Sequence, residues 1–456
     1  MGGDDIFGKG NLATATQIKA LPDTTALGGV DLLQSLTYGN GLILSKTFTQ
    51  DNELSQIIVE QGSIHVVNRS YGRSDNTNLD HIGYPLNPAY DETLGYTDAG
   101  RLATAAQTPA YGTRSYSYDA NGNRLTEVAN GVTNTYTYPA TSNRLSTVKQ
   151  GTTTTRAFSY DAAGNITQDL RGTAAYNYAV NNAGRIKTLT IGTSLRATYT
   201  YDAFQRLRIK VLSNGTPTGT THYVWDSFGH IIAEHAAGGA VAREYVWLGD
   251  TPIAVFDATT APTATFYVHP DHLDRPIAMT DATKAVVWSA RYEPFGMVSL
   301  ITGAAALNAR FPGQWFQIED GLAYNWHRTY DPTAGRYTQP DPLGFVDGPS
   351  VYGYAGQSPL MSIDASGLTA KWPPGGSGHN GGPPLDESKP NICPRPNNDN
   401  KPNRCLQNGP PLVDTTYNLV YCRYWCPKSG EFRDGMGMYM ERSGIAICPE
   451  MIDEIP

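Results

Sequence analysis

The sequence predicts an all-β protein in which small hairpins stack side by side into one continuous sheet. The hydrophobic fraction is 40%, enough for a core, but it is weighted towards aromatic residues that suit strands, with 28 Tyr against 12 Phe. The chain also contains 47 Gly and few long uninterrupted aliphatic stretches. This composition favours short strands joined by tight turns over a helical bundle. A recurring short unit points to the same fold class.

The recurring unit opens with an aromatic residue in most copies, continues with Asp or Asn and small residues, and closes with an aliphatic residue. Its copies lie at residues 96–102, 118–125, 138–145, 160–166, 180–186, 201–207 and 225–231. The closing aliphatic residues follow one another at intervals of 23, 20, 21, 20, 21 and 24 residues. A nearly fixed period indicates a repeat architecture. An ordinary β-sandwich of Tyr-rich hairpins is the alternative, and it does not require this regularity.

Each unit is expected to form one hairpin. Asp or Asn caps a turn, and the following Gly accepts a positive φ. The flanking stretches 114–118 and 135–138 alternate Tyr with small residues, so one face of each strand carries Tyr. A single hairpin is too small to bury that face, and neighbours must stack. We expect this repeat sheet over residues 31–265, after an irregular segment at 1–30.

Charge and hydropathy exclude several classes of function. The formal net charge is −8, so no general basic field attracts nucleic acid or an anionic membrane. The apolar runs fall short of the roughly 18–20 residues that span a bilayer. The start Met1–Asp5 lacks the basic and apolar regions of a Sec signal. We therefore expect a cytoplasmic protein before export, which leaves the cell through a dedicated machine or as a passenger.

Two Asp-containing turns lie where the composition of the chain changes. The runs Arg336–Phe345 and Pro359–Leu368 place Asp341 and Asp364 23 residues apart. All five cysteines and a Pro/Gly tract come after Leu368. Two carboxyl groups that share a site can activate water and protonate a leaving amine, because adjacent like charges raise one pKa. The sequence thus predicts a chain that cuts itself here; the alternative is that each Asp only caps its turn.

The residues after this junction divide into a linker and a small module. Residues 372–412 contain ten Pro and six Gly, which predicts an extended linker over 369–411. Three runs rich in strand-forming residues, at 416–426, 436–440 and 445–448, predict a small β-rich module over 412–456. A module of this size needs disulfides, a metal or a partner to be stable.

The five cysteines all lie in the last 64 residues, and their odd number leaves at least one thiol unpaired within the chain. Their C-x3-C pair matches no standard zinc pattern, so we predict no metal site and no cofactor. Disulfides formed after export, half of a zinc site and inert thiols remain open. The candidate thiols are Cys393, Cys405, Cys422, Cys426 and Cys448.

An ordered set of segments downstream of the repeats carries a family resemblance. These segments are residues 272–276, 280–282, 287–296, 310–314, 321–332, 335–337, 341–344, 352–355 and 359–368. Together with the repeats they resemble the Rhs/YD-repeat family over about residues 30–368. In that family the repeats wind into a large β-shell, followed by a core region that corresponds here to 266–368. The resemblance implies a curved sheet or, since family shells are larger, a partial β-shell.

The resemblance also assigns roles to individual residues. It implies an intramolecular aspartyl autoprotease with Asp341 and Asp364 as the acids and Arg328 as the residue that polarises or positions the site. The implied cut follows Leu368, at its bond to Thr369. The family usually has Asp-Pro in both runs, whereas the second run here has Ala after Asp364, which gives a less rigid loop. We expect cleavage to persist, and whether it is slowed stays open.

In the Rhs family the tail is a variable toxin used in interbacterial competition. It is delivered by contact-dependent or type VI-like secretion, and a cognate immunity protein meets it in the producer. The tail of this chain carries nine Lys/Arg and ten Asp/Glu, and its single histidine, His379, lies in the linker, so no particular toxin chemistry is indicated. The alternatives are a non-catalytic surface or adhesion module whose Tyr-rich strands bind carbohydrate or a partner, and a decayed fragment of a larger gene.

Overall fold

The computed structural model describes residues 32–74 and 78–371, together with strand β1 and seven short strands between residues 404 and 453. Two compact units result, residues 1–384 and 385–456. In the described residues every regular element is a strand, apart from the 3-10 turns η1 (Pro88–Tyr90) and η2 (Ala355–Gln357). No helix among them is long and apolar enough to span a bilayer.

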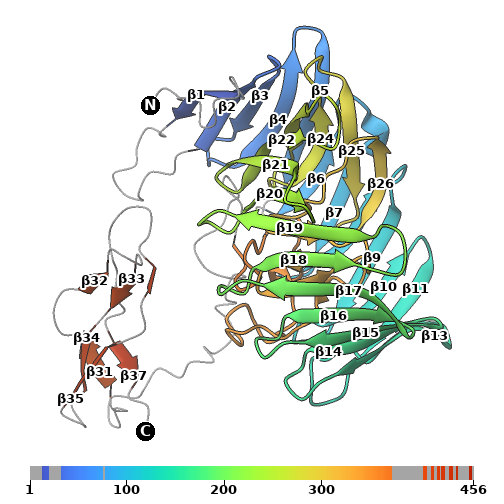
Figure 1. The fold of residues 1–456 in the computed structure, drawn as a ribbon, viewed down its shortest axis with the longest axis vertical. Coiled ribbons are helices and arrows are strands. Elements are labelled where there is room, and N and C mark those ends of the chain that lie inside the picture. Colours follow the sequence, from blue (N-terminus) through green and yellow to red (C-terminus); the bar gives the residue numbers. More distant parts are fainter. Residues whose placement is uncertain are drawn as a thin grey trace. The chain divides into compact units, whose positions relative to one another are not determined.

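The first unit is built on one antiparallel sheet of 26 strands. Each strand from β1 to β26 pairs with the next one along the chain, so the sheet is a continuous meander (Figure 1). The strands are β1 (Ala13–Lys19), β2 (Leu32–Tyr38), β3 (Ile43–Phe48), β4 (Leu54–Gln61), β5 (Ile64–Arg73), β6 (Leu79–Gly83), β7 (Glu92–Tyr96), β8 (Leu102–Gln107), β9 (Gly112–Tyr118), β10 (Arg124–Ala129), β11 (Val132–Thr137), β12 (Thr147–Gln150), β13 (Thr153–Tyr160), β14 (Ile166–Arg171), β15 (Ala174–Val180), β16 (Ile186–Ile191), β17 (Ser194–Tyr201), β18 (Leu207–Leu212), β19 (Gly219–Trp225), β20 (Ile231–Ala236), β21 (Val241–Leu248), β22 (Thr251–Asp257), β23 (Ala264–Pro270), β24 (Pro276–Thr280), β25 (Val286–Tyr292) and β26 (Val298–Gly303).

The turns of the repeat are built as the sequence predicts. In the copy at 160–166, the amide of Asn165 donates to the Asp161 Oδ1 atom at 2.8 Å, and the amide of Gly164 donates to the Asp161 carbonyl at 3.1 Å. Gly164 has a φ of +92°, a conformation that favours glycine. The same pattern of an Asp cap and a closing backbone bond recurs at 119–123, 202–206, 271–275 and 281–285.

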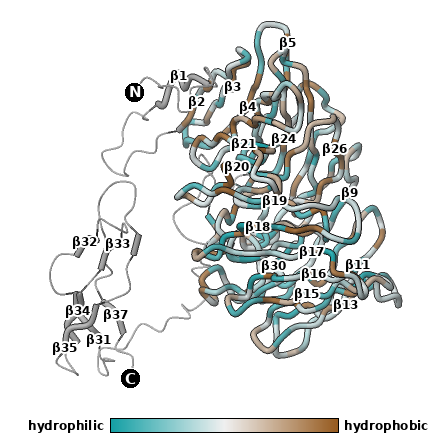
Figure 2. Tube along the Cα trace, viewed as in Figure 1, coloured by the Kyte–Doolittle hydropathy of each residue, from teal (hydrophilic) through white to brown (hydrophobic). Residues whose placement is uncertain are grey.

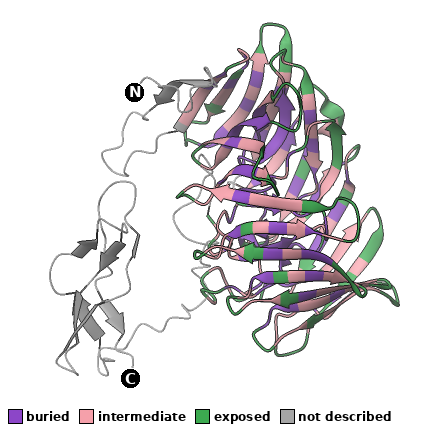
Figure 3. Cartoon of the chain, in the orientation of Figure 1, coloured by how far each residue is buried: buried purple, intermediate pink, exposed green. Residues whose placement is uncertain are grey.

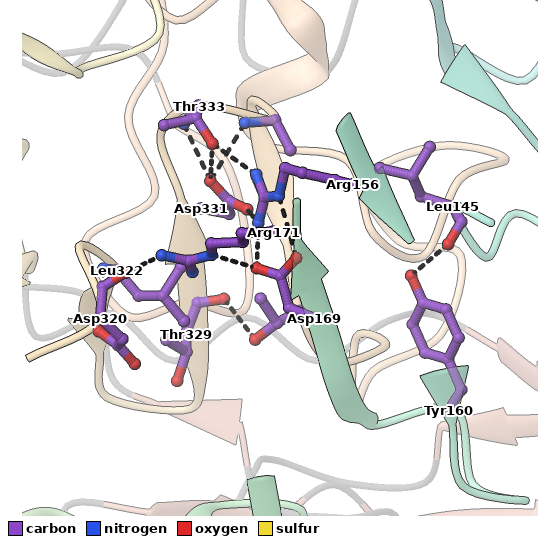
Figure 4. A network of polar contacts seen from close by, with 12 residues as sticks. Leu145, Arg156, Tyr160, Asp169, Arg171, Asp320, Leu322, Thr329, Asp331 and Thr333 are labelled. Carbon is purple, nitrogen blue, oxygen red and sulfur yellow. Dashed lines mark hydrogen bonds and ion pairs between the residues drawn. The ribbon is translucent and has the colours of Figure 1, made fainter. Parts of the chain in front are cut away.

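In most repeats a second bond links the unit to the one before it. The hydroxyl of Tyr160 donates to the carbonyl oxygen of Leu145, the aliphatic residue that closes the preceding unit, at 3.0 Å (Figure 4). We call this series of bonds the aromatic ladder. Its other members are the side chains of Tyr118, Tyr138, Tyr201, Trp225, Trp247 and Tyr292, each donating to a backbone carbonyl 14–18 residues earlier.

Two boundaries differ from the expectation. Strand β1 lies within residues 1–30, which the sequence analysis expected to be irregular, and it pairs with β2. Its sequence, Ala-Thr-Ala-Thr-Gln-Ile-Lys, alternates as a strand does, although it carries no copy of the repeat. The sheet also continues past residue 265 through β26, because turns at 271–275 and 281–285 keep the repeat geometry with Asp274 and Lys284 at positive φ in place of Gly.

Residues 304–371, called the central segment here, lie inside the curve of the sheet (orange in Figure 1). They form a small antiparallel sheet of β27 (Trp315–Phe316), β28 (Ala323–Asn325), β29 (Arg328–Asp331) and β30 (Arg336–Tyr337). Strands β28 to β30 are buried throughout. Burial in the large sheet varies along most strands, β24 is buried throughout, and many exposed residues lie at turns (Figure 3). Hydrophilic and hydrophobic residues likewise alternate with one another inside single strands, and no long part of the sheet is uniformly one or the other (Figure 2).

Buried polar contacts fasten the central segment to the sheet. Arg156 of β13 pairs with Asp169 of β14 and, at 2.7 Å, with Asp331 of β29 (Figure 4). Further along, Lys210 of β18 pairs with Glu319 at 3.2 Å. Apolar and aromatic residues of both parts form one hydrophobic core cluster. The sheet and the central segment therefore pack as one body.

The second unit contains two small antiparallel sheets, ordered β35-β34-β31-β37 and β32-β33-β36. The strands are β31 (Arg404–Gln407), β32 (Leu412–Asp414), β33 (Leu419–Tyr421), β34 (Arg423–Cys426), β35 (Glu431–Asp434), β36 (Met438–Tyr439) and β37 (Met451–Asp453). Strands β33, β34 and β36 fall within predicted runs, whereas residues 445–448 lie outside the described residues. Strand β31 falls within 369–411, which was expected to be an extended linker. The side chains of all five cysteines also lie outside the described part, so their pairing stays a prediction.

Candidate functional site

Arg328 joins the two aspartates that the sequence singled out. It lies at the start of β29, and its Nη1 and Nη2 atoms stand 2.8 Å from Asp341 Oδ2 and 2.9 Å from Asp364 Oδ2. All three side chains are at most 2% exposed. One guanidinium thus separates and holds two buried carboxylates, and the three residues assigned to catalysis by resemblance lie together.

In each carboxylate, one oxygen accepts a backbone amide of its turn and the other faces Arg328. The Oδ1 atom of Asp341 accepts the amide of Leu343 at 2.8 Å, and the Oδ1 atom of Asp364 accepts the amide of Leu368 at 3.0 Å. The Oδ2 atoms face Arg328. Turn capping and a shared acidic site, which the sequence presented as alternatives, are therefore compatible in the same side chains.

Two neighbours that sequence reasoning missed also contact Asp364. The hydroxyl of Tyr337 donates to Asp364 Oδ2 at 2.7 Å, and its ring centre lies 3.7 Å from the Arg328 guanidinium. Asn325 Nδ2 donates to the Tyr337 hydroxyl at 2.9 Å and to the Asp364 carbonyl at 2.8 Å. The pairing of β28, β29 and β30 brings these residues together. The only signal in the sequence was that both lie in segments that carry the family resemblance.

The predicted cleavage bond lies in a closed loop next to this cluster. Ile363 and Lys371 exchange two backbone hydrogen bonds, both 2.8 Å, and so close the loop at its base. Within it, Arg328 Nε donates to the carbonyl of Gly367 at 2.6 Å. Gly367 has a φ of +72°, and a Cβ there would lie 2.3 Å from the Asn325 carbonyl oxygen, so only glycine fits. Leu368 is half-buried and Thr369 is exposed.

A third carboxyl group, missed by the sequence analysis, contacts the other side of that bond. Asp347 Oδ2 accepts the amide of Ala370 at 2.9 Å. Burial raises the pKa of Asp347 to about 6; the charges of Asp364 and Asp341 act in the same direction, while the Ala370 hydrogen bond and Arg328 oppose them. In the sequence, Asp347 lies in a Gly-containing loop, and nothing there distinguishes it from an ordinary turn residue.

The surroundings of Asp341 shift its pKa upward. Burial raises its pKa above the usual range, Asp364 adds to that shift, and Arg328 and the Leu343 amide oppose it. A carboxyl group with a raised pKa beside a second carboxylate can act as a general acid. The arrangement therefore offers one proton donor, one nearby base and a cation that orients both. In the residues described, no group of three or more His, Cys, Asp or Glu is placed to hold a metal ion.

Comparison with known proteins shows what the chain is similar to. A family model described as the teneurin YD-shell matches residues 45–347. Toxin protein Tse5 of Pseudomonas aeruginosa is 27% identical over 345 residues, covering 64% of this chain and 26% of that protein. Double-stranded DNA deaminase toxin A of Burkholderia cenocepacia is 30% identical over 231 residues, covering 47% of this chain and 16% of that protein.

A solved structure shares the fold. The Photorhabdus luminescens Tc holotoxin pore matches 75% of this chain and 18% of its own, with a TM-score of 0.61 and 17% identity. Likeness at this identity concerns the fold alone. The chain spans about a quarter or less of the length of each of these proteins.

Proposed function

Because this chain belongs to the Rhs/YD-repeat family of YD-shell proteins, we propose that it is a shell that cuts its own chain after Leu368 and releases the following residues as an effector. One observation carries the proposal: Arg328 holds Asp341 and Asp364 at 2.8 and 2.9 Å, beside the loop that contains this bond. A structural turn needs no such pair of buried carboxylates.

The proposed chemistry is hydrolysis by an acid and a base. Asp364 accepts a proton from a water molecule, whose oxygen attacks the carbonyl carbon of Leu368. Asp341, with its raised pKa, donates a proton to the nitrogen of Thr369 as the carbon–nitrogen bond breaks. The products are a carboxylate at Leu368 and an amine at Thr369. Each molecule reacts once, because the substrate is its own chain.

Ala365, which stands where the family usually has Pro, does not leave the loop unsupported. The carbonyl of Asp364 accepts a hydrogen bond from Asn325 at 2.8 Å. Gly313 packs so closely that a Cβ there would lie 1.8 Å from the Ala365 carbonyl oxygen. These two contacts restrain the backbone around Ala365, where the proline ring is absent. We therefore expect cleavage to persist in this chain.

The released part, residues 369–456, is proposed to be a toxin. The support is that relatives named in the comparison are toxins, a deaminase among them. In this proposal a secretion machine delivers the protein in interbacterial competition, and an immunity protein neutralises the tail in the producing cell. The residues of the tail do not indicate which reaction it carries out.

The test is to express the full chain and its variants and to measure fragment masses and the N-terminal sequence. Wild type should yield a fragment that begins at Thr369, whereas Asp341→Asn and Asp364→Asn should stay intact. Asp281→Asn is the matched control, because Asp281 caps a sheet turn in the same way, accepting the Thr283 amide at 2.8 Å, but lies outside the site. Fragmentation of Asp364→Asn at the wild-type rate would remove that residue from catalysis.

The same cultures test the effector. Without an immunity partner, wild type should slow the growth of the host, and Asp364→Asn should slow it less because the tail stays attached. The comparison is made with and without export to the periplasm. Normal growth of wild-type cultures in both compartments, with the fragment present, would contradict the toxin proposal and leave self-cleavage standing.

A further inference from the structure

We propose that Asp347 is a third functional carboxyl group of the cleavage site, which anchors the tail side of the Leu368–Thr369 bond by binding the amide of Ala370. The inference rests on the proposed self-cleavage and adds a substrate-positioning residue to it. Its basis is the 2.9 Å contact from Ala370 N to Asp347 Oδ2 and the place of this contact in the loop.

The two sides of the bond are held by different residues. On the shell side, Arg328 binds the carbonyl of Gly367 at 2.6 Å and Asp364 binds the amide of Leu368 at 3.0 Å. On the tail side, Asp347 binds the amide of Ala370 at 2.9 Å, and the next residue pairs with Ile363. The bond to be cut therefore lies between two anchors, each of which includes a carboxylate.

One short segment supplies groups to both sides. Asp341 and Asp347 belong to the same run of turns, closed by backbone bonds from Gly344 to Asp341 at 3.1 Å and from Gly348 to Phe345 at 3.2 Å. Its first acid contacts Arg328 and its second contacts Ala370. Any movement of Asp347 therefore shifts the tail backbone relative to the acid pair. A misplacement of about 1 Å at a reacting bond can slow a reaction by about 100-fold.

The anchor should depend on pH. The groups that face Asp347 are the Asp364 and Asp341 carboxylates, the Arg328 guanidinium and the Ala370 amide. Its pKa of about 6 means that the carboxylate, the stronger acceptor, forms as pH rises through that value. The contribution of this contact to the cleavage rate should therefore increase over the same window.

The kinetic test uses the full chain made by cell-free synthesis, pulse-labelled and shifted to buffers from pH ~5 to ~8, with the fragment followed on gels. Asp347→Ala should slow cleavage by at least about 10-fold at pH ~8, and by less below pH ~6, where the protonated Asp347 is already the weaker acceptor. Asp347→Asn keeps an acceptor oxygen, so it should stay within about 3-fold of wild type at high pH, and its rate relative to wild type should increase below pH ~6. Equal rates for Asp347→Ala and wild type would overturn the inference while leaving self-cleavage intact.

Asp250→Asn is the matched control. Asp250 also contacts the tail, through Lys371 at 3.1 Å, but that ion pair is exposed and contributes little to positioning. Its replacement should leave the cleavage rate within about 2-fold of wild type. A loss as large as that of Asp347→Ala would show that general weakening of the loop, rather than the Asp347 contact, controls the rate.

A second measurement does not depend on cleavage. In the Asp364→Asn chain, hydrogen exchange at the Ala370 amide should be slow, should become faster with Asp347→Ala, and should stay slow with Asp347→Asn. Unchanged protection in Asp347→Ala would overturn the anchor directly. If wild type were never cut but the exchange results held, the proposed function would fail and the binding role of Asp347 would stand. A purely structural role would not produce the pH-dependent ratio described above.

Discussion

At the scale of single residues, Arg328 is the side chain on which the acidic cluster depends. Its three guanidinium nitrogens contact Asp341, Asp364 and the carbonyl of Gly367 within 2.9 Å. A buried carboxylate is costly without a partner, and here a single cation serves two of them. The cluster is therefore stable only as a unit.

Arg328→Met should lower the free energy of unfolding of the shell by about 3–5 kcal/mol, because it leaves buried carboxylates unpaired. It should also abolish cleavage. Urea unfolding of the Asp364→Asn chain with and without the change measures the part of the first effect that belongs to Asp341, without interference from cutting. Arg206→Met, which removes a partly exposed pair with Asp202, is the control and should cost about 1 kcal/mol or less. Similar losses for both arginines would mean that the cluster has no special energetic role.

The sequence predicted part of this site. Asp341 and Asp364 were recognisable because each opens a Gly-containing turn at a change of composition. Tyr337, Asn325 and Asp347 were not, because their roles arise from contacts made across strands and loops. Asn325 pairs with Arg328 across β28 and β29, a register that sequence spacing alone does not reveal.

At the scale of the repeat element, the predicted hairpins and their period match the structure because turn chemistry is local. Asp161 and Gly164 determine their turn through bonds within five residues. The aromatic ladder was not predicted, since it joins one unit to the next. Turns such as 281–285 were missed because Lys284 takes the positive φ of 72° that elsewhere belongs to glycine. The pairing of β24 with β25 compensates for the unfavourable backbone conformation of Lys284.

Tyr160→Phe should destabilise the shell by about 1 kcal/mol, because the Leu145 carbonyl loses its 3.0 Å hydrogen bond while the ring packing is kept. Urea unfolding and hydrogen exchange in the two neighbouring hairpins measure the effect. Tyr176→Phe is the control, since Tyr176 contributes its ring face to Arg171 and takes no part in the ladder. It should change stability by less than about 0.5 kcal/mol. Equal effects of the two changes would argue against the ladder.

At the scale of the whole first unit, the central segment packs inside the curve of the sheet and shares its core. Glu319 and Asp320 of that segment are adjacent, buried and close to the sheet, yet they are placed differently. Glu319 accepts the Tyr199 hydroxyl at 2.8 Å and pairs with Lys210 at 3.2 Å. Asp320 accepts the Leu322 amide through Oδ1, while its Oδ2 atom has no hydrogen-bond partner among the described residues.

Because Asp320 is buried without a partner for its Oδ2 atom in the described part of the chain, the free energy of unfolding should decrease as pH rises. Burial, and then the charge of Glu319, raise the pKa of Asp320 to about 7, with Arg171 and Lys210 opposing. The unfolded chain has the ordinary, lower pKa, so between pH ~4 and ~7 the folded state binds more protons and its free energy of unfolding decreases with pH. Asp320→Asn removes that penalty. It should stabilise the shell by about 2–4 kcal/mol at pH ~8 and leave it nearly unchanged at pH ~4, where the aspartate is already neutral.

Urea unfolding of the two chains across this pH range measures the effect, with Glu319→Gln as the matched neighbour. Because Glu319 is paired, its replacement should destabilise the shell at pH ~8 by leaving Lys210 buried without a carboxylate. Adjacent acids should therefore respond in opposite directions to the same chemical change. If Asp320→Asn instead destabilised the shell at high pH, Asp320 would be ionised and paired in the folded protein, as Glu319 is.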